Sequence, residues 1–136
     1  MKIDFKLIRQ ILLSFEDENL EDKLVNDSFE LSEKKYYSNS KTFDKEDIIA
    51  YHISYLQDSG LVIDINAAAN SSGKFQLLLG ARPRLSATGH DFLNSIRNDT
   101  IFNKIIDRIS ESGVSATMDI VKDLGVSIAK QMLKLN

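Results

Sequence analysis

The apolar positions follow a helical period over most of the chain. Between Asp4 and Phe15 they recur at intervals of three, four and three residues, which places them on one face of an amphipathic helix. The same period predicts a helix from Asp44 to Ser59, with Asp44 as its N-cap. Three more helices follow, one capped by Ser86, one from Asp99 or Thr100 to Gly113, and one from about Thr117 to Leu135.

A different pattern separates the Asp44 helix from the Ser86 helix. Gly60 ends the first of these, because glycine tolerates the left-handed conformation at a helix C-terminus. Leu61 to Ile65 and Phe75 to Leu79 then predict two paired strands, joined by a small, polar turn. Arg82-Pro83-Arg84 leads out of the hairpin as an extended corner, because proline restricts its own φ and the residue before it.

This order of elements predicts a mainly α protein with a small β-hairpin (α+β), namely a winged helix-turn-helix with additional C-terminal helices. We expect residues 1–98 to form the winged-helix-like domain. Residues 99–136 would be a helical extension that packs on this domain or on a dimer mate. The stretch from Glu16 to Glu33 holds eight acidic residues and one lysine, which predicts a solvated loop. Residues 28–40 show no clear helix and could instead give short strands.

Composition excludes several kinds of site. Of the 136 residues none is cysteine, so there is no disulfide and no thiolate metal site. The two histidines lack further ligands at metal spacing: His90-Asp91 has no companions, and His52 falls on the apolar side of its helix. No nucleophile motif or phosphate loop is present. We therefore expect no enzyme, no metal and no cofactor. No long apolar run exists, which predicts a cytoplasmic protein without a membrane segment.

The net charge of −3 argues against a strongly basic nucleic-acid binder, yet local basic groups leave DNA binding open. Tyrosine and serine on the outer side of the Asp44 helix could reach base edges, and basic residues near the hairpin could contact phosphates. The candidate nucleic-acid-binding residues are Lys45, Tyr51, Ser54, Lys74, Arg82 and Arg84.

The last helix carries an apolar seam with intervals of three, four, four and three residues. Such a seam must be buried, either against a second copy of the chain or within one chain. The candidate dimer-interface residues are Val121, Leu124, Ile128, Met132 and Leu135.

Three segments together resemble one known family: residues 4–16, 48–62 and 85–105, with Tyr51-His52, Gly60-Leu61 and Gly89 as their marks. They are similar to domain-of-unknown-function family 2513, which consists of short bacterial, phage and prophage proteins. The resemblance implies a winged-helix-like fold and a mobile-element origin, and it implies no activity.

Two functions remain open. The first is a phage- or prophage-type DNA-binding or regulatory protein that would dock as a dimer, with the Asp44 helix near the major groove and the hairpin on the DNA backbone. The second is a winged helix used as a protein–protein interaction module, an adaptor or antagonist of a host factor. A continuous positive stripe that joins the hairpin to the Asp44 helix would favour DNA.

Overall fold

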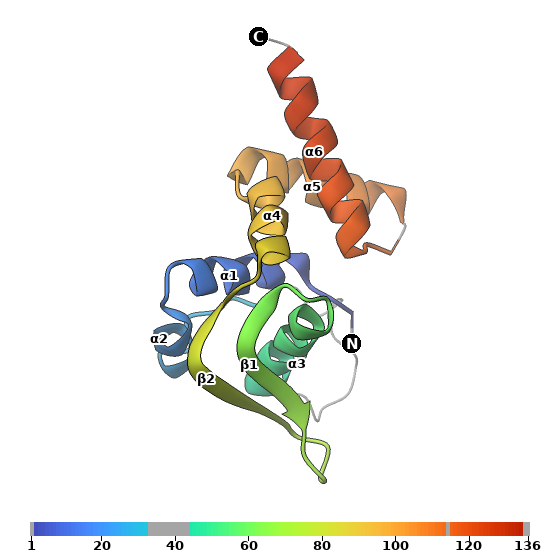
Figure 1. Cartoon of the computed structure of the whole chain (residues 1–136). Helices are drawn as coiled ribbons and strands as arrows, with labels where there is room; N and C mark the ends of the chain where they lie inside the picture. The colour runs from blue at the N-terminus through green and yellow to red at the C-terminus, as the bar shows by residue number, and fades with distance from the viewer. Residues whose placement is uncertain (1, 33–43, 114, 135–136) are drawn as a thin grey trace. The chain divides into compact units, whose positions relative to one another are not determined.

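The helices and one hairpin are arranged as Figure 1 shows, in a computed structural model that describes residues 2–32, 44–113 and 115–134. Contacts divide the chain into two units, Met1–His90 and Asp91–Asn136. The predicted boundary after residue 98 falls between two helices, whereas this division falls inside one. In the described residues the protein is mainly helical, with six helices and a two-stranded antiparallel sheet.

The first unit holds three helices and the sheet. They are α1 (Phe5–Glu16), α2 (Leu20–Val25), α3 (Lys45–Asp58), β1 (Val62–Ala69) and β2 (Phe75–Leu85). Helix α3 packs against α1 and against both strands, so it is the central element of this unit. Its predicted start is confirmed, because the Asp44 carboxylate accepts the Asp47 backbone N–H at 2.9 Å.

The predicted acidic loop is wrong in part, because it contains α2. Leu20 and Leu24 lie four residues apart and share one face of this helix, and Leu20 is buried. Glu21 and Asp22 occupy the first turn, where negative charge is favourable at the helix N-terminus. The many acidic residues of this stretch therefore made the helical spacing of Leu20 and Leu24 hard to recognise in the sequence. Of the predicted strands in 28–40, residues 28–32 form none and 33–40 lie outside the described residues.

The hairpin is longer than predicted. Strand β1 continues through the alanines to Ala69, and β2 includes Arg82-Pro83-Arg84. The register changes from Ile65↔Leu79 to Ile63↔Arg84, so residues 80–83 lie opposite Asp64 alone and form a bulge.

Asp64 closes this bulge with its side chain. Its backbone has φ 63°, and its carboxylate accepts the Arg82 backbone N–H at 2.6 Å. A Cβ on Gly80 would collide with that carboxylate. Glycine at position 80 therefore lets the carboxylate reach across, and the prediction of a proline corner missed this cross-strand contact.

Three helices make up the rest of the chain: α4 (Ala87–Ile96), α5 (Asp99–Ser112) and α6 (Met118–Lys134). Helix α4 begins in the first unit, where Ser86 Oγ accepts the Gly89 N–H at 2.9 Å, so the predicted Ser86 cap is confirmed. Helix α5 is capped by Asn98 and ends at Gly113, whose φ is 68°. None of the described helices is both long and apolar enough to cross a membrane.

The apolar seam of α6 is partly buried within the single chain. Val121 and Ile128 are almost fully buried, whereas Leu124 and Met132 are half-buried. Leu135 lies outside the described residues. A dimer interface along this seam stays a prediction, because one chain already covers two of its five residues.

Candidate binding surfaces

The histidine of the Tyr51-His52 pair belongs to the core, as predicted. His52 is fully buried, its Nε2 accepts the backbone N–H of Asp4 at 2.9 Å, and its Nδ1 lies 2.7 Å from the carbonyl of Ile48. Because Nε2 accepts, Nδ1 carries the proton and donates to that carbonyl. Burial lowers the pKa of His52 below 6.5, while the Ile48 hydrogen bond and the Asp4 charge oppose this shift.

Asp4 joins the start of α1 to the segment after α2. Its carboxylate accepts the N–H groups of Lys6 and Leu7, at 3.0 and 3.3 Å, and so caps α1. The same carboxylate accepts the Ser32 N–H at 3.1 Å and the Ser32 hydroxyl at 2.9 Å. This buried cluster connects three parts of the fold, and Asp4 at its centre is only 1% exposed.

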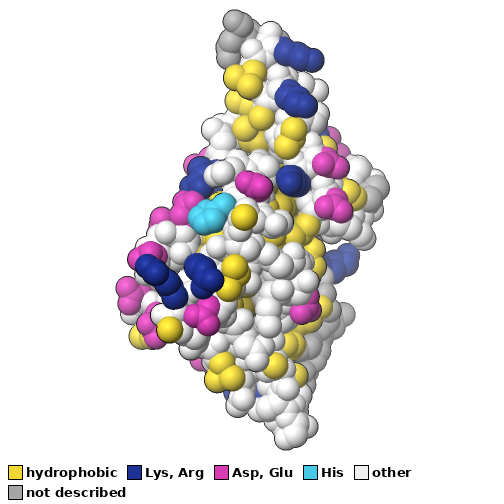
Figure 2. Space-filling model, viewed as in Figure 1, with side chains coloured by type: hydrophobic (Ala, Val, Ile, Leu, Met, Phe, Trp, Pro, Cys, Tyr) yellow, Lys and Arg dark blue, Asp and Glu magenta, His cyan; other side chains and the backbone are white. Residues whose placement is uncertain are grey.

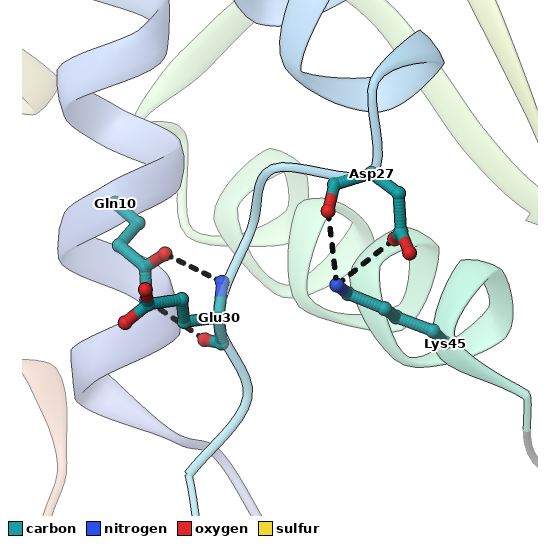
Figure 3. Close-up of polar contacts among 4 residues, drawn as sticks. All are labelled: Gln10, Asp27, Glu30 and Lys45. Atoms are coloured by element: carbon teal, nitrogen blue, oxygen red, sulfur yellow. Dashed lines mark hydrogen bonds and ion pairs between the residues drawn. The ribbon is translucent and has the colours of Figure 1, made fainter.

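Lys45, a predicted phosphate contact, is engaged in holding the segment after α2 (Figure 3). Its Nζ lies 2.9 Å from the Asp27 carboxylate and 3.3 Å from the Asp27 carbonyl oxygen. On the α1 side, the amide of Gln10 makes two hydrogen bonds to the backbone of Glu30, each 2.8 Å long. Phe29, between these two attachments, is buried.

Both predicted base-reading residues of α3 are half-buried and make contacts within the protein. Tyr51 is half-buried and packs edge-on against Phe75, with ring centroids 5.8 Å apart. Ser54 is half-buried and donates its hydroxyl to the Tyr51 carbonyl at 2.7 Å. The exposed residues of α3 are Glu46 and Asp58, both acidic. The most accessible side chains of α3 therefore carry negative charge, which is unfavourable for contact with DNA phosphates.

The other three DNA candidates are exposed on the hairpin. Lys74 lies in the turn, and Arg82 and Arg84 lie at the far end of β2. The rise per strand residue places the two arginines on the order of 20 Å from Lys74. The Arg84 guanidinium donates to the Arg82 carbonyl at 3.2 Å. On the face shown in Figure 2, basic side chains lie beside acidic ones and do not form a continuous positive stripe.

The outer face of the hairpin, the side turned away from α3, is partly apolar. We define it by the cross-strand pairs Ile63↔Arg84 and Ala68↔Gln76 together with Leu78. Leu78 is 65% exposed and Ile63 is 39% exposed, whereas their neighbours Leu77 and Val62 turn inward. None of these five residues is acidic. The run of three leucines from 77 to 79 is the sequence signal for this face, because successive strand residues point to opposite sides.

A second surface is a groove of about 650 Å³ that α2, α3 and β2 form together, and sequence reasoning missed it. Its lining comes from three separate segments, so no local motif marks it. We call it the α2–α3–β2 groove, and it is lined by Leu24, Val25, Asp27, Asp44, Lys45, Glu46, Ile49, Ala50, Phe75 and Leu77. In the part of the chain that is described, no three His, Asp or Glu side chains are grouped to hold a metal ion.

The comparisons with known proteins agree with the resemblance. The chain matches the family described as "Hypothetical protein (DUF2513)" over residues 2–115. A Haemophilus influenzae protein named "Uncharacterized protein" is 32% identical over 134 residues, covering 98% of this chain and 99% of its own length. No solved structure matches the chain. The chain therefore belongs to the DUF2513 family, and the implied phage origin stays a prediction.

Proposed function

We propose that this protein is a non-catalytic interaction module of winged-helix type whose ligand is another protein, bound by the outer face of the hairpin. The exposure of Leu78 at the centre of that face carries the proposal. Leucine is worth about 1.5–3 kcal/mol when fully buried, so covering a side chain that is 65% exposed contributes about 1–2 kcal/mol. An interface of ordinary strength needs a few such apolar anchors, and Ile63 is a second one.

The charges beside these anchors suggest the chemistry of the partner. Arg84 lies opposite Ile63, and Lys74 lies at the end of the same hairpin. A partner with an apolar patch bordered by aspartate or glutamate would complement them. Such binding corresponds to the adaptor or antagonist function. The acidic exposed residues of α3 favour this function over recognition of the DNA major groove.

Duplex DNA is the second candidate, because β2 and the turn before it carry three exposed basic residues and no acid. They could contact two to four phosphates per chain, which corresponds to a log–log salt slope of about −2 to −4. The separation of Lys74 from the two arginines and the acidic exposed positions of α3 weigh against this candidate. In addition, the exposed side chain of Leu78 can make no favourable polar contact with DNA phosphates.

Site-specific photo-crosslinking separates the two candidates. A benzophenone side chain at position 78 should give a discrete protein adduct in native cells, and the adduct should weaken when Arg84→Glu is added. Lys122, an exposed residue of α6, is the control position and should give no such adduct. Absence of an adduct at 78, together with binding of labelled genomic duplexes that Arg82→Ala and Arg84→Ala weaken, would transfer the function to DNA.

A further inference from the structure

The α2–α3–β2 groove lies on the opposite side of β2 from the outer face of the hairpin. Phe75 and Leu77 line the groove, whereas Gln76 and Leu78 belong to the outer face. A ligand in the groove therefore makes no use of the surface proposed above. Either surface can fail to bind without consequence for the other.

We call the apolar lining of the groove its floor, and this lining is accessible. Val25 is 81% exposed, and Leu24, Phe75 and Leu77 are half-buried at its sides. Ile49 lies beneath them and is buried. A volume of about 650 Å³ lies within the usual range of ligand sites, roughly 300–1,000 Å³, and accommodates several side chains. Apolar side chains are thus the groups that this floor would take from water.

Among the residues that the structure describes, the rim of the groove is negative. Asp27, Asp44 and Glu46 line it with one lysine, Lys45, and that lysine is already paired with Asp27 at 2.9 Å. The Asp44 carboxylate accepts only a neutral backbone N–H in its capping bond, so its charge is not cancelled there. Glu46 is exposed beside it. An incoming segment with basic flanks would therefore be attracted, and one with acidic flanks would be repelled.

We infer that the α2–α3–β2 groove binds an amphipathic segment of a partner protein, with apolar side chains on the floor and lysine or arginine at the rim. The apolar floor supplies affinity and the rim selects the charge of the flanks. This is the helix-in-groove or extended-segment mode of peptide recognition, in which a few apolar anchors carry the contact.

Two synthetic peptides test this inference on the full chain. They share one set of leucine and phenylalanine anchors, and one carries lysine flanks where the other carries glutamate. Fluorescence anisotropy should show about tenfold tighter binding of the lysine peptide, and the preference should shrink as salt rises. Glu46→Lys should weaken the lysine peptide about fivefold or more. Val25→Ser should weaken both peptides, because it removes apolar floor.

Matched controls keep the result specific. Glu21→Lys changes the same charge at an exposed position of α2 outside the groove and should leave the preference intact. Thermal melts check that each variant remains folded, which the exposure of Val25, Glu46 and Glu21 favours. Equal binding of both peptides, or binding that Glu46→Lys and Val25→Ser leave unchanged, would overturn the inference.

Other occupants have distinct signatures. Binding of neither peptide until residues 33–43 are replaced by a glycine–serine linker would assign the groove to the chain itself. Concentration-dependent self-association that Val25→Ser abolishes would assign it to a second copy. Each result overturns the proposed partner segment.

Discussion

Replacing Asp4 by alanine should destabilise the protein more than the loss of an ordinary helix cap. The substitution removes the N-cap of α1, which costs about 0.5–2 kcal/mol. It also leaves the Ser32 N–H and hydroxyl without their shared acceptor, and hydrogen bonds to a charged group contribute about 1.5–3 kcal/mol when fully formed. Since Ser32 is half-buried and can partly rehydrate, we expect a total loss of about 3 kcal/mol.

Asp44→Ala is the matched control, because Asp44 is also an N-cap but is exposed, and its one described capping bond goes to Asp47. It should cost about 1 kcal/mol. Urea unfolding followed by circular dichroism measures the two losses in free energy of unfolding. In thermal melts, a chain of this length should lose roughly 10 °C in Tm for Asp4→Ala and roughly 4 °C for Asp44→Ala. A double-mutant cycle of Asp4→Ala with Ser32→Ala should show coupling above about 0.5 kcal/mol. Equal losses for the two caps and no coupling would refute the joining role of Asp4.

Two further predictions concern the pH response and the packing of α6. The pKa of His52 is lowered by burial, so the unfolded chain binds the extra proton first as pH falls below 6.5, and stability should fall with a slope of up to about 1.4 kcal/mol per pH unit. His52→Gln should flatten this part of the stability curve, and a wild-type curve as flat as that of the variant would contradict the prediction. Gly125→Ala should destabilise the protein, because the new Cβ would lie 2.4 Å from the Ser95 carbonyl oxygen, although helix propensity alone predicts a gain of about 1 kcal/mol. The exposed neighbour Ser127→Ala should change stability by less than about 0.5 kcal/mol, and a gain in Tm for Gly125→Ala would show that α6 does not approach Ser95 so closely.

The sequence predicted those features that depend on neighbours along the chain. The period of apolar residues located α1, α3, α5 and α6, because one turn of helix brings residues three and four apart onto one face. Asp44 and Ser86 were predicted as caps, since a cap needs only its own side chain and the amides of the next turn. The burial of His52 also followed from its position on the wheel of α3.

The tertiary structure decided which partners the predicted surface side chains contact. Lys45 and Tyr51 are residue types that often contact DNA, but here Lys45 pairs with Asp27 and Tyr51 packs on Phe75. These partners are distant along the chain, so the helical period of the sequence does not reveal them. The hairpin bulge depends on Asp64 reaching Arg82. Within the acidic stretch, residues 20–25 form a helix that contacts α1 and buries Leu20. Contacts between distant segments are set by packing geometry, and the sequence specifies that geometry only through the whole fold. The groove, whose lining comes from three separate elements, exists only in that geometry.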